Sequence, residues 1–293
     1  MTTNIHKAAG MLAIACALAL TPDSAKAAIA YTDGDLILGF RANGGTGANT
    51  DYLIDLGNAA SILNSQVAIT FSLGAIGTDL NALYTAGWTN RGDVLWSVSG
   101  VQKAAGNGFS TNTMFATRSD TISAPLGTGT TVPWFRFSVA GGGAPALKIQ
   151  SLGTKFGLGT TGNVSGTDQI ESTNAPGALI QPISQSNSYA SFMPGGSNSN
   201  ASTAFLVFPD ANGIEGTFGS GTVASVLDLY KVVPGSGGAT LPSEFTGTFS
   251  ITNGAVVTYT PFAVPEPTTA TALAVGGVFL ASMRRRRAVT KAS

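Results

Sequence analysis

Short runs of β-branched and aromatic residues, separated by glycine, asparagine, serine and proline, restrict what this chain can fold into. Of the 38 glycines in 293 residues, 35 lie between residues 28 and 264, so turn formers recur too often for long helices. Apolar runs of this length between turn formers are typical of β-strands. We predict strands at 35–41, 67–73, 94–101, 113–118, 134–139, 146–152, 204–208 and 226–233.

The clearest local pattern is a β-hairpin near residue 250, in which two alternating runs flank Asn253-Gly254. Asparagine followed by glycine predicts a type I′ turn, because both central residues of that turn need φ > 0. In the first run Phe245, Phe249 and Ile251 are spaced by even numbers, so we expect them on one face of the strand, in the core.

One short helix is expected over residues 79–86, with Thr78 as its N-cap. The chain shows no internal repeat of constant period. Residues 28–263 are therefore predicted to be one mainly β domain, an antiparallel β-sandwich or jelly roll with one or two short helices.

The first 27 residues have the order of a secretory signal peptide. A weakly basic start is followed by 13 apolar residues (8–20) and by Ala25-Lys26-Ala27, a small-x-small cleavage site. The apolar run is too short to span a hydrocarbon core of about 30 Å at about 1.5 Å per residue. We expect the secretion translocon to export the chain and a signal peptidase to cut after Ala27.

The only histidine, His6, and the only cysteine, Cys16, both lie in this predicted signal peptide. A lipoprotein role for Cys16 is disfavoured because Ala13 stands where a lipobox has leucine. The mature chain then cannot form a Ser-His-Asp or Cys-His nucleophile system, or an ordinary His/Cys zinc or copper site. We predict no catalytic residue and no enzyme activity.

Charge is sparse in the region between the two ends. Residues 28–263 hold 8 basic and 13 acidic residues, a formal charge of about −5. Nucleic-acid binding needs a basic face for the phosphates, so this composition argues against it.

The C-terminus combines three features in a fixed order. Val264-Pro265-Glu266-Pro267 precedes sixteen uncharged residues (268–283), which end at Arg284-Arg285-Arg286-Arg287. As a helix the uncharged run would be about 24 Å long, and arginine snorkelling could compensate for the shortfall across a membrane. The positive-inside rule places the arginines in the cytoplasm and the rest of the chain outside. The alternative is a core helix followed by a solvated basic tail.

This order of features resembles the PEP-CTERM sorting signal of Gram-negative bacteria over about the last thirty residues. The resemblance implies an exosortase, a membrane cysteine protease that cuts near Pro265-Glu266-Pro267, and export in organisms that make exopolysaccharide and biofilm matrix. Residues 34–41 and 226–231 also resemble ectodomains that accompany this signal. On this interpretation residues 264–287 are the sorting signal with a transmembrane helix, and residues 288–293 are a cytoplasmic tail.

Carboxylates are the only catalytic side chains that this composition leaves, and they occur in sequence-local pairs. A glycosidase needs two carboxyl groups about 5–10 Å apart, whereas carboxylates beside glycine or asparagine commonly cap turns. The same acids could bind Ca²⁺, and Asp33-Gly34-Asp35 is the best candidate for this. The alternative is that these three residues form the turn at which the first strand begins. The pairs are Asp33/Asp35, Asp51/Asp55, Asp168/Glu171 and Asp210/Glu215.

Three tryptophans could stack on sugar rings. Trp96 and Trp134 lie in strand-like runs and are expected in the core. Trp88 is the one of the three that could be exposed and bind a sugar, but a core position is favoured for it as well. The glycine-rich segments 44–47 and 127–131 lack the Lys-Ser/Thr ending of a phosphate-binding loop and are expected to be hairpin loops.

These observations lead to three functional hypotheses. The first is a surface or matrix protein, anchored at least transiently in the inner membrane, with a non-catalytic β-domain associated with biofilm and no cofactor. The second is a module that binds exopolysaccharide through Trp88. The third is a carboxylate-based glycoside hydrolase.

Overall fold

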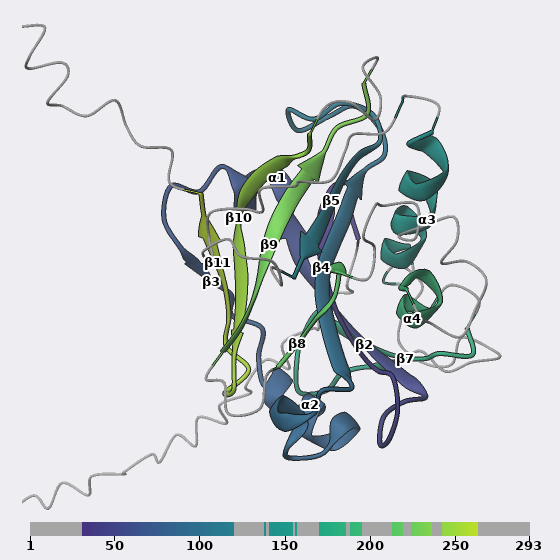
Figure 1. The fold of residues 1–293 in the computed structure, drawn as a ribbon, viewed down its shortest axis with the longest axis vertical. Helices are drawn as coiled ribbons and strands as arrows, with labels where there is room; N and C mark the ends of the chain where they lie inside the picture. Colours follow the sequence, from purple (N-terminus) through teal and green to yellow (C-terminus); the bar gives the residue numbers. More distant parts are fainter. Residues whose placement is uncertain are drawn as a thin grey trace, which may run out of the picture.

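The computed structural model describes residues 31–119, 138, 141–154, 156, 170–185, 188–194, 213–218, 224–235 and 242–262. Within these residues, eleven strands form one antiparallel sheet in the order β3-β11-β10-β9-β5-β4-β1-β2-β7-β6, with β8 beside β4 (Figure 1). The strands are β1 Asp35–Ala42, β2 Thr50–Asn58, β3 Ile69–Thr70, β4 Val94–Gln102, β5 Thr113–Arg118, β6 Ile170–Glu171, β7 Ala178–Pro182, β8 Gly216–Thr217, β9 Ala224–Val232, β10 Glu244–Thr252 and β11 Val257–Pro261. The helices are α1 Ala59–Leu63, α2 Ile76–Tyr84, the 3₁₀ turn η1 Trp88–Asn90, α3 Gly143–Gly153 and α4 Tyr189–Phe192.

The mainly β, antiparallel class is confirmed, but the described strands make a single curled sheet where two facing sheets were expected. Two register shifts interrupt the ladders, one between Leu36 and Ile37 in β1 and one between Phe245 and Gly247 in β10. Such bulges bend a strand and increase its local twist. These bulges contribute to the curl of the sheet.

Each face of the sheet has its own hydrophobic core. On one side, called here the α2 face, alternate residues such as Leu38, Phe40 and Trp96 pack with α1, α2 and η1. On the other side, the α3 face, Ile37 and Met114 pack against α3 and α4. Figure 1 shows α3 and α4 together on one side of the sheet. The period of two along a strand sends neighbouring residues into different cores.

Residues 146–152, predicted as a strand, lie in α3. Ala146, Ile149 and Leu152 are three residues apart and are buried, whereas Leu147 is 55% exposed. This spacing fits one face of a helix and does not alternate. The strand prediction for this run is therefore wrong, and Ile149 is the only β-branched residue in it.

The expected helix exists but begins earlier than predicted, at Ile76. Its N-cap is Ala75, which makes no side-chain capping bond, so Thr78 is not the cap. Ile76, Leu80 and Tyr84 are buried on one side. Apolar spacing therefore located the helix, but the capping pattern did not locate its first residue.

The β10–β11 hairpin is present, but its turn is not type I′. The left-handed residue is Ala255, with φ 60°, and Ala255 N donates to Thr252 O at 2.9 Å. This is a type I turn followed by one residue of positive φ, the commonest three-residue hairpin loop. Phe249 and Ile251 join the core on the α2 face as expected, whereas the bulge turns Phe245 towards the α3 face.

The other strand predictions have mixed outcomes. Strands β1, β4, β5 and β9 match their predicted runs within two residues at each end. Of residues 67–73, only Ile69–Thr70 form a strand, and the strands β2, β6, β7 and β8 were not predicted. Residues 204–208, and 134–139 apart from Ser138, lie outside the described residues.

Among the helices of the described residues, none combines the length and the apolar character that a membrane span needs. The predicted span 268–283 lies outside the described residues.

Candidate functional site

A buried ion pair joins β1 to the segment that leads into β8. Arg41 Nε lies 2.8 Å from Glu215 Oε1, Arg41 Nη2 lies 2.5 Å from Glu215 Oε2, and the two side chains are 3% and 5% exposed. The same guanidinium also donates to Asn43 Oδ1 and, at 2.8 Å, to Pro194 O. A buried charge is tolerated only when it is paired and hydrogen-bonded in this way.

Asp51 of β2 lies beside this ion pair, under the N-terminus of α4. Its Oδ2 accepts a hydrogen bond from Ala190 N at 2.8 Å. Burial raises the pKa of the Asp51 carboxyl to about 7, although the bond from Ala190 and the charge of Arg41 oppose the shift. Asp51 Oδ1 and the side-chain amide of Gln181, its register partner on β7, make no hydrogen bond within the described residues.

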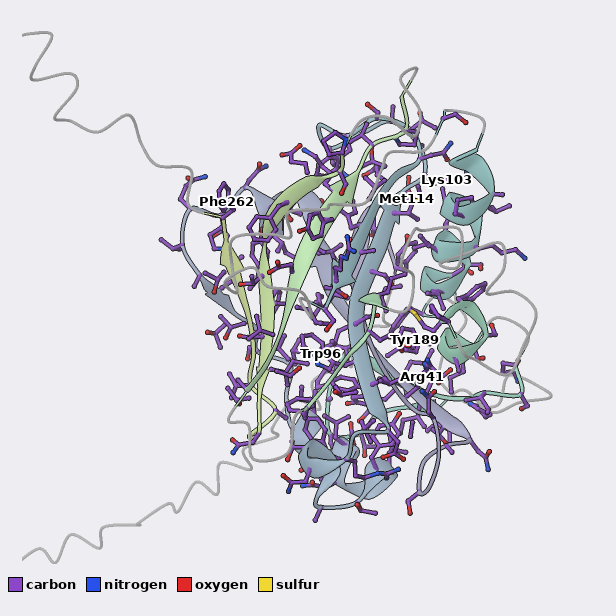
Figure 2. The ribbon with its side chains drawn as sticks, in the orientation of Figure 1. Arg41, Trp96, Lys103, Met114, Tyr189 and Phe262 are labelled. Carbon is purple, nitrogen blue, oxygen red and sulfur yellow. The ribbon has the colours of Figure 1, made fainter. Side chains whose placement is uncertain are left out.

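Tyr189 completes this group of polar side chains on the α3 face. Its hydroxyl lies 2.6 Å from Ser97 Oγ, and its ring lies directly over Gly39. Figure 2 shows Arg41 and Tyr189 near one another between the sheet and α4. Arg41, Asp51, Ser97 and Tyr189 are all buried. This group therefore fixes α4 on the sheet and offers no surface to a ligand.

Replacing Gly39 by alanine should destabilise the protein, because the new Cβ would lie 2.3 Å from Tyr189 Cε2. The ring is fully buried and held by Ser97, so we expect the free energy of unfolding to fall by about 1–3 kcal/mol. Urea denaturation would measure the change. Gly87→Ala is the control, because nothing lies within 4 Å of a Cβ there; equal losses in the two variants would contradict the packing explanation.

The predicted calcium candidates, Asp33 and Asp35, both accept hydrogen bonds from protein groups. Asp33 accepts hydrogen bonds from Lys103 N at 2.7 Å, Ala104 N at 2.8 Å and Gln102 Nε2 at 3.0 Å. Asp35 Oδ2 accepts from Thr32 N at 2.6 Å. Within the described residues no group of three or more His, Cys, Asp or Glu side chains could hold a metal ion.

The carboxylates that are paired in the sequence do not all form pairs in the structure. Asp51 lies under α4, whereas Asp55 is near Asp35, and burial followed by the Asp35 charge raises the pKa of Asp55 to about 6. Glu215 pairs with Arg41, and Asp168 and Asp210 lie outside the described residues.

Trp88 is buried, which agrees with the favoured core position and rules out the alternative of an exposed, sugar-binding tryptophan. Its side chain is 2% exposed, with ring centroids 4.7 Å from Phe218 and 6.0 Å from Phe40. The flanking Gly87 and Thr89-Asn90 suggested a surface loop, but η1 turns the indole into the core of the α2 face. Trp88 is therefore not a surface ligand for a sugar. Trp96 is in the core as expected, and Trp134 lies outside the described residues.

The glycine-rich segment 44–47 connects β1 to β2, as a hairpin loop should. Arg91 holds it by donating to Gly44 O and Thr46 O, each at 2.8 Å. The segment 127–131 lies outside the described residues, as do the processing and sorting residues Ala25, Ala27, Val264, Pro265, Glu266, Pro267, Arg284, Arg285, Arg286 and Arg287.

The candidate ligand site is an open groove of about 440 Å³ at the end of β10 and β11, called here the rim groove. Its walls come from the segment after α1, from β9 and from the two hairpin strands. The residues that line it include Asn64, Gln66, Lys231, Glu244, Phe245 and Phe262. Figure 2 shows Phe262 at the outer edge of the sheet, on the opposite side of the picture from Arg41 and Tyr189.

The sequence did not reveal this groove. Phe245 was assigned to the core, but Gly247 in the same strand marks the bulge that turns it away. A glycine inside an alternating run was the one local signal that could have corrected the assignment.

No protein-family model, curated protein or solved structure matches the chain.

Proposed function

We propose that this chain is an exported protein whose β-domain is displayed at the cell surface or in the extracellular matrix after exosortase-type sorting. One observation carries the proposal: Pro265-Glu266-Pro267, an uncharged run of sixteen residues and four arginines follow one another at the C-terminus. The run would anchor the protein in the inner membrane, with the arginines in the cytoplasm. A signal peptide at the other end would deliver the domain to the far side.

The position of the folded region supports this division of the chain. Strand β1 begins at Asp35, eight residues after the predicted cleavage at Ala27, and β11 ends at Pro261, three residues before Val264. Both processing segments thus flank the sheet, and their removal would leave every described strand intact. An exposed Phe262 then precedes the sorting signal.

A structural, biofilm-associated role without catalysis fits the environment of the acids in the described region. Asp33 accepts hydrogen bonds from the backbone that follows β4, and Asp35 accepts one within the turn before β1. Asp51 accepts a hydrogen bond at the N-terminus of α4, and Glu215 pairs with Arg41. These four carboxylates thus have a place in the fold, and the glycoside hydrolase hypothesis gains no support from them.

Deletion of residues 264–293 tests the proposal. We expect the full-length chain in the membrane or surface fraction and the truncated chain in the periplasm or medium, because the anchor and the arginines are gone. Fractionation and immunoblotting measure this. Identical fractionation of the two chains would refute the anchoring.

A second variant separates anchoring from cutting. Replacing Pro265, Glu266 and Pro267 by alanines keeps the apolar run and the arginines, so the protein should stay in the membrane and keep its C-terminus. Intact mass of the extracted protein reports both cleavages. Loss of the C-terminus in this variant, at the same position as in the natural sequence, would exclude the Pro-Glu-Pro segment as the cutting site.

A further inference from the structure

We propose that the rim groove binds a segment of a neutral polysaccharide, with Phe245 and Phe262 as its apolar surface and Glu244, Lys231, Asn64 and Gln66 as its hydrogen-bonding rim. The biological source of the glycan, the cell's own matrix, rests on the proposed surface location. The groove itself does not depend on that location.

The aromatic residues form the apolar part of the groove. Phe262 is 45% exposed, and its ring centroid lies 5.2 Å from that of Phe245. Phe245 is fixed from behind by Tyr230, at 5.7 Å. Aromatic faces bury large area at low cost in conformational entropy, and the C–H faces of pyranose rings pack against them. The exposed Phe262 and the half-buried Phe245, with the buried Tyr230 behind them, therefore form a prepared contact surface.

The polar residues supply donors and acceptors beside the two rings. Lys231 Nζ lies 2.7 Å from Glu244 Oε2, and the two side chains are 21% and 55% exposed. Asn64 and Gln66 add exposed amides from the other wall. Small-ligand sites generally have volumes of about 300–1,000 Å³, and the rim groove, at about 440 Å³, lies within this range.

The charge of the groove selects among ligands. Among the described residues that line it, the charged ones are Lys231 and Glu244, which neutralise one another, so these residues give no net positive charge to attract a phosphate or a uronic acid. A hydroxyl-rich, uncharged ligand suits this balance, because its hydroxyls can donate to the carboxylate and accept from the ammonium group.

An extended peptide fits the groove less well. Peptides commonly bind by adding a strand to a sheet edge, which requires free backbone donors. At this edge β11 ends in Pro261, which has no N–H, and Phe262 N already donates to Thr246 O at 2.9 Å. The backbone there has little left to offer a peptide.

The test uses the full-length protein, purified in a detergent without sugar groups. Binding of cellohexaose, laminarihexaose, mannohexaose and chitohexaose is measured by calorimetry, with an alginate hexamer as the acidic comparison. We expect at least one neutral hexaose to bind, and Phe262→Ala and Glu244→Gln each to weaken that binding at least fivefold.

Leu147→Ala is the matched control, since Leu147 is 55% exposed on α3, outside the groove. Its affinity should equal that of the natural sequence, and circular dichroism should show all three variants folded. The proposal is overturned if no neutral hexaose binds, if only alginate binds, or if Phe262→Ala and Leu147→Ala behave alike. Surface display is measured separately by fractionation, so the proposal of glycan binding and the proposal of surface display can each be refuted independently of the other.

Discussion

Replacing Arg41 by methionine should lower the free energy of unfolding by about 3–5 kcal/mol, because it leaves the Glu215 carboxylate buried without its partner. Glu215 would lose three close contacts to the guanidinium, at 2.5, 2.8 and 3.0 Å. Asp51 would also lose a positive neighbour that favours its charged form. Urea denaturation of residues 28–263 would measure the loss.

Two comparisons test the cause of this loss. The double variant Arg41→Met/Glu215→Leu should regain much of the stability, since apolar pairs often replace buried ion pairs at little cost. Lys231→Met removes a cation from an exposed pair of similar length and should cost at most about 1 kcal/mol. The explanation would be wrong if the double variant were as unstable as Arg41→Met alone.

Local sequence patterns predicted those strands that consist mainly of apolar and β-branched residues and have turn formers on both sides. In β1, β4, β5 and β9, apolar and β-branched residues dominate, and turn formers lie at both ends. Strand β2 was missed because Asp51 and Asp55 interrupt its apolar run. The structure tolerates Asp51 there because Ala190 N, 139 residues away, donates to it. A partner so distant in sequence leaves no local trace.

The rim groove and the burial of Trp88 also depend on contacts between residues that are distant in sequence. The groove is assembled from residues near 64, 109, 231, 245 and 262, which only the sheet order brings together. Trp88 follows a glycine and precedes polar residues, as an exposed residue would, yet Phe40 and Phe218 from two distant segments enclose it. Contacts between distant segments determine both the position of the groove and the burial of Trp88, and composition could not predict these contacts.

Asp51 should make the protein less stable as the pH rises from about 4 to about 7. Burial raises the pKa of its carboxyl from 3.8 to about 7, so in this range the folded chain holds a proton that the unfolded chain has released. Stability falls with pH wherever the folded state binds more protons, and it levels off above the folded-state pKa. Three pKa units correspond to a loss of up to about 4 kcal/mol.

Asp51→Asn should remove most of this slope, because the amide oxygen can still accept from Ala190 N while carrying no charge. Urea midpoints between pH 4.5 and 8 would then fall steeply for the natural sequence and shallowly for the variant. A smaller slope of the same sign should remain from Asp55, whose pKa burial raises to about 6. Glu244→Gln, on the exposed rim, is the control and should keep the steep slope. Parallel curves for Asp51→Asn and the natural sequence would mean that the buried carboxyl does not govern the pH dependence.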